Sequence, residues 1–410
     1  MASSSQSAGK PGFRLPKRLN RRWNQTQRDL RFLISGLRGQ RGPVVIPRSE
    51  NEAMDQSWLE WIDIPEYEIQ STQMETGEAM SVFLSPLGSI QPHEAGQFLT
   101  LVLEDEDGEF RRAYSIVSPA NTEGPLQLTV KALPGGRASD RALRALRPGQ
   151  TIHALGPSGK FVWNSAEDSP RELTMYAGGS GITPLMSIIT TALEQSSDTR
   201  IRLLFANQNE ESIIFRERLT ELRERFADRF CLDHMLENPP KGWSGLRGRP
   251  NAKAVNEWSR GPEHLSDASH HYLCGPAGMM EQVLEALHSQ GTPELHLHRE
   301  SFTSPQRVTD DTQEFERQIC VIDNGEGEVR VVVEPGQTVL TAALNAGIDL
   351  PFSCTMGGCG ACQVELLSGE VALEEPHCLS DHELASGLRL TCVGRPLTNL
   401  RIRKKAPTRA

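Results

Sequence analysis

The chain has 410 residues, of which 37% are hydrophobic and 23% charged, the composition of an ordinary soluble globular protein. This apolar content is enough for hydrophobic cores, so wholesale disorder, a collagen helix and a coiled coil are excluded. At about 100–200 residues per domain, the length predicts two to four domains. No apolar run approaches the roughly 18–20 residues that span a bilayer, and we expect no transmembrane segment.

Charge and cysteine usage narrow the class of protein further. Residues 1–50 carry a net charge of +9, whereas the whole chain carries −10. An acidic body argues against nucleic acid as the main ligand, and we expect none. Eight cysteines are too few for a disulfide scaffold, and half of them crowd one short region. The N-terminus also lacks the apolar stretch of a secretory signal, so we predict a cytoplasmic protein whose reduced thiols hold a metal.

The first predicted elements, in chain order, belong to an arm and a β domain. Residues 1–57, rich in Ser, Gly, Pro and Arg, are expected to form a flexible basic arm, with a docking or targeting segment as the alternative. Residues 58–166 contain short alternating segments between turn formers, at spacings typical of an antiparallel β-barrel. Two of these expected strands are 98–103 and 126–130.

Strands and helices alternate from residue 167 to 302, which predicts an α/β domain with a parallel sheet. The expected strands are 173–176, 201–205, 231–236, 271–274 and 295–301, and the expected helices are 184–193, 212–226 and 278–288. A polar linker follows over 303–312. Residues 313–400 contain β segments, one short helix at 339–346 and the cysteine cluster, and a basic tail occupies 401–410.

The sharpest motif is the cysteine cluster, in which Cys354, Cys359 and Cys362 are followed by Cys392. Its C-x4-C-x2-C…C spacing is the plant-type spacing of [2Fe–2S] centres. Glycines between the cysteines let backbone N–H groups approach the sulfur atoms. A zinc site would favour two C-x-x-C pairs, and only one is present. Residues 313–400 resemble a plant-type ferredoxin domain, an α+β fold of the β-grasp type, and this resemblance makes the four cysteines the metal ligands.

A second set of motifs lies in the β-barrel segment. Residues 112–115 (Arg-Ala-Tyr-Ser) are preceded by Gly-Gln-Phe at 96–98 and followed by glycine-containing motifs at 134–139 and 156–161. In this order, the four pieces resemble the flavin-binding barrel of the ferredoxin–NADP⁺ reductase superfamily.

The resemblance gives each flavin motif a task. It implies that Arg112 pairs with a flavin phosphate, that Tyr114 lies against the isoalloxazine ring, and that Ser115 hydrogen-bonds its N5 edge. The Gly-Gly-x-x-Ser motif would meet the pyrophosphate at a helix N-terminus, an arrangement typical of FAD, with FMN as the alternative. The residues assigned to the flavin are Arg112, Ala113, Tyr114, Ser115, Gly135, Gly136 and Ser139.

A glycine-rich turn at 177–184 follows the first parallel strand and opens a helix. It lacks the full G-x-G-x-x-G pattern, so alone it is modest support for a nucleotide site. In the superfamily this turn passes under the pyrophosphate of a nicotinamide dinucleotide, and the residue matching Cys274 lies near the nicotinamide and the flavin. We therefore expect Ser115, Cys274 and Glu300 to be catalytic, with Glu300 matching the superfamily's acidic–aromatic element. The residues assigned to the dinucleotide are Gly178, Gly179, Gly181, Thr183, Cys274, Gly275 and Pro276.

The end of the second parallel strand bears on the choice of nucleotide. Many relatives have Asn-Arg there, and the arginine can hold the 2′-phosphate of NADPH. This chain has Gln208, with the acidic pair Glu210 and Glu211 behind it, which favours NADH. Arg216 leaves NADPH open.

The order of flavin barrel, dinucleotide domain and ferredoxin resembles the reductase components of oxygenases and the reductase of the hybrid-cluster protein. The resemblance implies that hydride passes from NAD(P)H to FAD, and that single electrons then pass through the [2Fe–2S] centre to a separate terminal acceptor protein. One alternative is a terminal flavin reductase that acts directly on a small acceptor. A more distant one is a non-enzymatic redox sensor.

Overall fold

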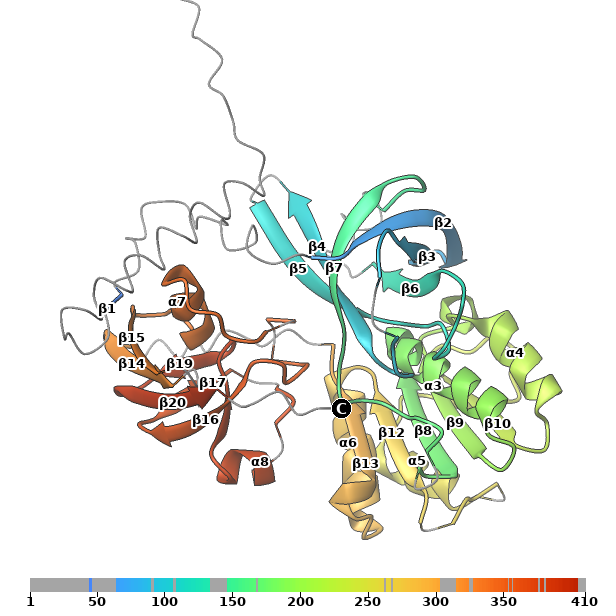
Figure 1. Cartoon of the computed structure of the whole chain (residues 1–410). Coiled ribbons are helices and arrows are strands. Elements are labelled where there is room, and N and C mark those ends of the chain that lie inside the picture. The colour runs from blue at the N-terminus through green and yellow to red at the C-terminus, as the bar shows by residue number, and fades with distance from the viewer. Residues whose placement is uncertain are drawn as a thin grey trace, which may run out of the picture.

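The computed structural model describes three domains, which occupy separate parts of the molecule (Figure 1). Among the described residues, no helix combines the length and apolarity that a membrane crossing requires. The described residues are 44–45, 64–89, 92–105, 108–132, 146–166, 169–261, 263–266, 268–302, 315–323, 327–352, 354–355, 357–374, 377–379 and 381–404. Outside them lie the rest of the expected arm, Gly135, Gly136, Ser139, the linker at 303–312 and residues 405–410.

The first domain is a six-stranded antiparallel sheet. Its strands are β2 (Glu66–Thr76), β3 (Ala79–Pro86), β4 (Phe98–Asp105), β5 (Gly108–Ser115), β6 (Leu126–Lys131) and β7 (Thr151–Ser158). They follow the order β5-β4-β7-β2-β3-β6. Ile116, which directly follows β5, forms a bridge with Leu128 of β6, so the two outer strands of this order meet. Residues from β2, β3, β4, β6 and β7 share one buried core, although β3 and β6 are buried at most positions rather than alternately.

The second domain is a six-stranded parallel sheet with helices on both faces (Figure 1). Its strands are β8 (Glu172–Gly178), β9 (Arg200–Asn207), β10 (Phe230–Leu236), β11 (Leu246–Arg247), β12 (His270–Cys274) and β13 (Leu297–Glu300), in the order β11-β10-β9-β8-β12-β13. Its helices are α3 (Ile182–Gln195), α4 (Arg216–Arg225), α5 (Ala252–Ser259) and α6 (Ala277–Ser289), with 3-10 turns η2 (Gly179–Gly181), η3 (Glu210–Ser212) and η4 (Glu294–His296). Helices α3 and α4 share one core with the sheet, whereas α5 and α6 cover the opposite face.

Some expected elements of this domain differ from the structure in their limits. Helix α4 begins at Arg216 rather than at residue 212, because Phe215 has a left-handed backbone (φ 59°) that cannot continue a helix. The strand expected at 295–301 begins at Leu297, since η4 precedes it. The sequence did not predict β11 or α5, which have only 2 and 8 residues.

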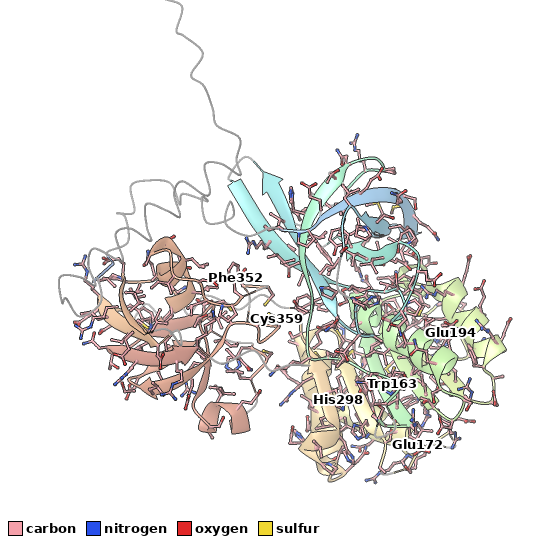
Figure 2. All side chains as sticks on the ribbon, viewed as in Figure 1. Trp163, Glu172, Glu194, His298, Phe352 and Cys359 are labelled. Carbon is pink, nitrogen blue, oxygen red and sulfur yellow. The ribbon has the colours of Figure 1, made fainter. Side chains whose placement is uncertain are left out.

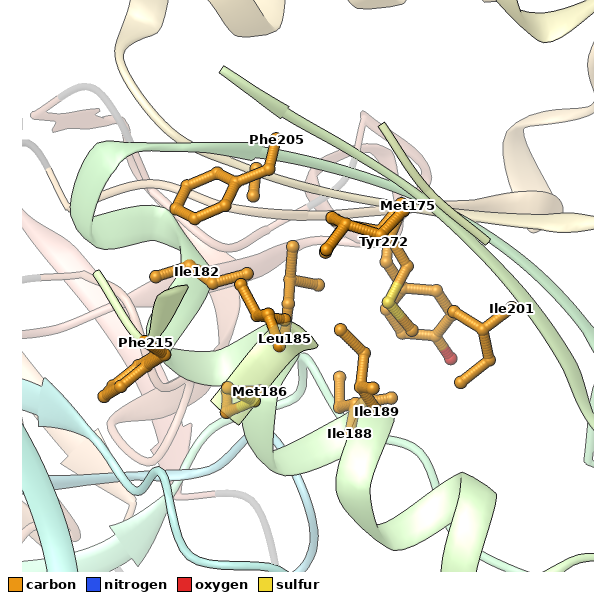
Figure 3. Packing of buried hydrophobic residues seen from close by; sticks show 14 of the residues in the cluster. Met175, Ile182, Leu185, Met186, Ile188, Ile189, Ile201, Phe205, Phe215 and Tyr272 are labelled. Atoms are coloured by element: carbon orange, nitrogen blue, oxygen red, sulfur yellow. The ribbon is translucent and has the colours of Figure 1, made fainter. Parts of the chain in front are cut away.

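The first two domains share a continuous hydrophobic core. Trp163, which follows β7, belongs to the same buried cluster as Ile188 of α3 and Tyr272 of β12. Figure 3 shows the α3 side of this cluster, with Ile188 among the side chains packed against the sheet. The Ser187 hydroxyl of α3 also donates a hydrogen bond to the Ser118 carbonyl at 2.7 Å. This shared core holds the antiparallel sheet of the first domain against the second domain, at the edge where the parallel strands end.

The third domain is a mixed sheet with two short helices, as expected for an α+β ferredoxin fold. Its main sheet contains β14 (Gln318–Asp323), β15 (Glu328–Val333), β16 (Gln363–Ser368), β18 (Leu388–Leu390) and β20 (Leu400–Lys404), in the order β15-β14-β20-β16-β18. A separate pair consists of β17 (Val371–Leu373) and β19 (Gly394–Pro396), and the helices are α7 (Val339–Asn345) and α8 (Asp381–Ala385). Helix α7 confirms the helix expected at 339–346 to within one residue.

The boundary expected at residue 400 is wrong, because residues 401–404 belong to the ferredoxin sheet. Strand β20 pairs in parallel with β14 and antiparallel with β16, and Ile402 is fully buried. Alternation of buried and exposed residues along β20 is the signal that its basic composition obscured. At the opposite edge, β1 (Val44–Val45) pairs in parallel with β15. These two residues of the expected flexible arm therefore lie in the sheet.

Candidate functional site

The residues predicted to be catalytic meet at the carboxyl ends of parallel strands. Cys274 ends β12, and its register partners are Ala177 of β8 and Glu300 of β13. Ser115 ends β5 of the first domain, and its hydroxyl donates a hydrogen bond to Glu300 Oε2 at 3.5 Å. The structure therefore brings Ser115, Cys274 and Glu300 together where the first two domains join. Parallel α/β sheets bind ligands at this same edge.

Burial sets the protonation of the two acidic groups in this site. It raises the pKa of the Glu300 carboxyl to about 8, although the hydrogen bond from Ser115 acts in the opposite direction. Burial, followed by the charge of Glu300, also raises the pKa of the Cys274 thiol well above its usual range. Both groups are therefore protonated at neutral pH.

The glycine turn after β8 leaves no room for side chains. A Cβ at Gly181 would lie 2.1 Å from the Cys274 carbonyl oxygen, and one at Gly178 would lie 2.6 Å from Met279 Sδ. Gly179 has a φ of +52°, in the left-handed region that glycine adopts without strain. The turn is thus held against the end of β12, with the N-terminus of α3 directly behind it. Such a cradle of backbone N–H groups fits a pyrophosphate.

The predicted residues on either side of this turn complete its walls. Pro276 Cδ lies 2.7 Å from the Cβ position at Gly178, and the nitrogen of Gly275 lies 2.8 Å from that at Gly181. Thr183 lies in the first turn of α3 and is 2% exposed, and its hydroxyl donates a hydrogen bond to the Ser180 carbonyl at 2.9 Å. All predicted dinucleotide residues therefore lie at one edge of the sheet, and their assignment to the nucleotide stays a prediction.

Two further residues at this edge were missed in the sequence. Asn207 ends β9 and is 9% exposed, yet neither atom of its amide has a hydrogen-bond partner. A buried amide without partners is costly, so this side chain fits a site that a polar ligand completes. Lys131 ends β6, and its Nζ lies 3.8 Å from the Cβ position at Gly179. Sequence gives no sign of that contact, because it joins two domains.

The acidic pair predicted to favour NADH lies directly beyond β9. Glu210 belongs to η3, whose start is fixed by a capping box between Asn209 and Ser212. The Glu210 carboxylate forms an ion pair with the guanidinium of Arg216 at the start of α4. Arg216 is the residue for which NADPH remained possible as the donor. Its guanidinium is therefore already paired with the Glu210 carboxylate.

The flavin motif at 112–115 lies at the end of β5. The Tyr114 side chain packs against the core of the sheet, and this burial raises its pKa to about 12, with the charge of Arg112 acting in the opposite direction. Arg112 Nη1 donates a hydrogen bond to the Arg111 carbonyl at 2.7 Å. Ala113 faces another way and packs against Phe98. The structure places these residues on one strand, and their contacts with a flavin stay a prediction.

The four cysteines predicted as ligands form two buried pairs. Side-chain hydrogen bonds join Cys354 with Cys359, and Cys362 with Cys392. The backbone N–H of Gly357 donates to Cys392 Sγ at 3.3 Å, and the backbone N–H of Ala361 donates to Cys359 Sγ at 3.4 Å. Two thiolate pairs with N–H donors fit a cluster of two irons. Among the described residues, no three His, Cys, Asp or Glu side chains converge on a single ion.

Backbone conformation explains why the cysteine loop is rich in glycine. Gly357 and Gly360 have φ values of +76° and +72°, in the left-handed region. A Cβ at Gly357 would also lie 3.3 Å from the Val393 side chain. Glycine at these positions therefore lets the loop curl around the sulfur atoms, as the sequence predicts.

Family models match the same three domains. Residues 86–163 match an oxidoreductase FAD-binding domain, residues 175–285 an oxidoreductase NAD-binding domain, and residues 321–397 a 2Fe-2S iron-sulfur cluster binding domain. Each match covers one domain of the structure.

Curated relatives share this organisation over most of their length. The chain is 30% identical to a component of 1,2-phenylacetyl-CoA epoxidase from Escherichia coli (strain K12), over 81% of this chain and 94% of the relative. It is 33% identical to "3-ketosteroid-9-alpha-monooxygenase, ferredoxin reductase component" of Mycolicibacterium smegmatis (strain ATCC 700084 / mc(2)155), over 82% and 95%. Among solved structures, phthalate dioxygenase reductase aligns with a TM-score of 0.54 at 21% identity, over 84% of this chain and 98% of that one.

The fold and the matched domains define an NAD(P)H oxidoreductase that carries FAD and a [2Fe–2S] cluster. Its electrons pass from NAD(P)H through FAD to the cluster. With this identity and coverage, the chain belongs to the family of oxygenase ferredoxin reductase components.

Proposed function

We propose that this chain takes electrons from NADH and delivers them singly to a separate terminal oxygenase protein. The observation that carries this proposal is one pair of residues in adjacent strands. Ser115 of β5 contacts Glu300 at the nucleotide edge, and its register partner Phe98 of β4 packs against Cys354 and Cys359. A single strand pair therefore joins the expected hydride site to the expected cluster ligands.

The chain's residues contribute binding, orientation and protonation to this relay. FAD and the cluster, when bound, supply the conversion of a hydride into single electrons. The crowded glycine turn and Lys131 would hold the pyrophosphate of the dinucleotide. Ser115, held by Glu300, would orient the reacting edge of the flavin, and the shared core of the first two domains keeps water away from it. Cys354, Cys359, Cys362 and Cys392 would ligate the two irons.

NADH as the donor rests on the pair of Glu210 and Arg216. An arginine beside the adenosine ribose would attract a 2′-phosphate, but Glu210 both occupies the guanidinium and adds a negative charge. Gln208 is uncharged and stands where many relatives have the arginine that can hold a 2′-phosphate. These features favour a nucleotide without the 2′-phosphate.

The activities of the relatives support an oxygenase as the acceptor. The relatives are components of an epoxidase and of monooxygenases, such as the "Glycine betaine monooxygenase reductase subunit" of Pseudomonas aeruginosa (strain UCBPP-PA14). A hybrid-cluster protein, the other acceptor expected from sequence, has no such support among them. We also place the protein in the cytoplasm, since all eight cysteines are free, as in a reducing compartment.

Assays that combine the anaerobically purified protein with a candidate terminal oxygenase, run in aerated buffer because the oxygenase consumes O2, test the proposal. We expect the purified protein to contain flavin and iron, and NADH consumption to require both the oxygenase and its substrate. Stoichiometric oxidation of NADH by a small metabolite, without any partner protein, would instead identify a terminal flavin reductase.

A further inference from the structure

The two cysteine pairs lie in different surroundings. Cys362 and Cys392 belong to the hydrophobic core of the ferredoxin domain itself. Cys354 and Cys359 belong instead to a small cluster with Phe98, and Ala113 packs against it. Cys354 and Cys359, which the core of their own domain does not enclose, are thus covered by the antiparallel sheet of the first domain.

Polar and aromatic contacts surround this apolar one. Lys160 Nζ lies 2.9 Å from Glu383 Oε1 of α8, and Lys160 Cε lies 3.1 Å from the Cβ position at Gly360 in the cysteine loop. The Arg111 guanidinium lies 5.7 Å from the centre of the Phe352 ring. Figure 2 shows Phe352 and Cys359 on the side of the ferredoxin domain that faces the other two domains. We call these contacts the dock.

The dock restricts how electrons can leave. Protein lies behind Cys362 and Cys392, so the side with Cys354 and Cys359 is where another redox group can come closest to the irons. In the dock, the first domain occupies the side with Cys354 and Cys359. A terminal oxygenase, a whole folded protein, cannot reach Cys354 and Cys359 from this side while Phe98 and Lys160 cover it, although Gly358 and Ala361 of the loop stay exposed.

We propose that the ferredoxin domain occupies the dock to be reduced and leaves it to reduce the terminal oxygenase through the same cysteine loop. This inference rests on the proposed function. The ferredoxin domain takes up one electron in the dock and gives up that electron after release, so each hydride supports two such cycles.

The composition of the dock suits repeated release. Its ion pair is exposed, with 49% of the Lys160 side chain and 27% of the Glu383 side chain accessible to solvent. Exposed ion pairs contribute little to stability and are screened by salt. Its apolar part is small, with one aromatic ring and one alanine against two cysteines. Arg111, which is 8% exposed, adds the contact with the Phe352 ring.

A zero-length cross-link tests the proposal in the holoprotein. A water-soluble carbodiimide joins a carboxylate and an amine that already touch, and it carries away the displaced oxygen as a urea. We expect an amide between Lys160 and Glu383, identified by mass spectrometry of the linked peptides. Within the described residues, this is the only lysine–carboxylate pair that joins two domains. Lys160→Gln, treated identically, is the matched control, since it retains every other cross-link.

The cross-linked protein should separate electron uptake from delivery. We expect NADH to reduce its cluster as fast as in the untreated protein, while anaerobic reduction of cytochrome c falls in proportion to the linked fraction. Treated Lys160→Gln should keep its cytochrome c reduction. Undiminished delivery by the linked protein would overturn the proposal, as would the absence of the link in a protein whose cluster NADH still reduces. A cluster that NADH does not reduce in untreated protein would contradict the proposed function instead.

Discussion

Glu300 is a carboxyl group that the fold keeps protonated at neutral pH. Its pKa is about 8 in the folded chain, against 4.5 for an ordinary glutamate, because burial penalises the charged form. Between these two pH values the unfolded chain binds fewer protons at this group than the folded chain does. The contribution of Glu300 to the free energy of unfolding therefore falls as the pH rises through this window.

Removing the ionisable group should remove that pH dependence. We expect Glu300→Gln to abolish a stability loss that reaches about 1.4 kcal/mol per pH unit in the wild type. Denaturant unfolding at several pH values between 4.5 and 8 measures it. Glu285→Gln, at an exposed position of α6, should retain the wild-type slope. Parallel pH profiles for the wild type and Glu300→Gln would show that Glu300 ionises normally.

The pair of Glu210 and Arg216 gives a second prediction at the scale of single residues. Glu210→Gln removes the acid that holds Arg216, so the guanidinium becomes available to a 2′-phosphate. A charged hydrogen bond worth about 1.5 kcal/mol would raise kcat/KM for NADPH about tenfold and leave NADH nearly unchanged. Steady-state kinetics with ferricyanide measures both nucleotides. Glu211→Gln is the control, and the double variant with Arg216→Gln should lose the gain. A gain that survives in the double variant would exclude Arg216 as its cause.

At the scale of elements, local pattern predicted what local forces determine. Strand β9 and helix α3 were found because each is a long apolar segment: β9 is buried at every position after Arg200, and α3 is buried from Ile182 to Leu193. The start of α4 was missed because the left-handed backbone of Phe215 is set by its burial in the core. Strand β20 was missed because its partners β14 and β16 are distant in sequence.

The same distinction applies to the site. Cysteine spacing indicated a [2Fe–2S] centre, and resemblance to a ferredoxin domain supplied the ligand set, because three thiols lie on one loop and Cys392 follows far along the chain. The neighbourhood of Lys131, Asn207 and Phe98 depends on how domains pack, and no local pattern encodes it. Resemblance to a family supplied the grouping of Ser115, Cys274 and Glu300, which the structure brings together.

The cysteine loop provides the prediction that belongs to this scale. Cys359→Ser should remove the visible absorption of the cluster and the reduction of cytochrome c, because one of four thiolates is lost. Reduction of the flavin by NADH should change by less than about twofold, since Cys359 belongs to the ligand set and not to the nucleotide edge. Cys378→Ser, a half-buried thiol outside the spacing, is the control and should keep both activities. A folded Cys359→Ser variant whose flavin NADH no longer reduces would refute this division between domains.

At the scale of the molecule, the three domains are joined unequally. The first two domains share a continuous core. Strand β5 and the edge of the parallel sheet that carries Cys274 and Glu300 therefore form one rigid unit. The ferredoxin domain has its own core and meets that unit through the small dock. Hydride transfer needs close and lasting alignment, whereas delivery to another protein needs access. The distribution of buried contacts matches these two requirements.

The ferredoxin sheet also depends on a segment from the other end of the chain. Val44 and Val45 pair with Arg330 and Val331 of β15, which would otherwise be the outer strand of the sheet. An uncovered outer strand offers free N–H and C=O groups to another copy of the chain. Deleting residues 1–50 should therefore promote concentration-dependent association. Deleting only residues 1–40 keeps both valines but removes most of the positive charge, so this shorter deletion should remain monodisperse if strand pairing rather than charge prevents association. Light scattering coupled to size-exclusion chromatography compares the two, and equal behaviour of both deletions would show that β1 does not protect this edge.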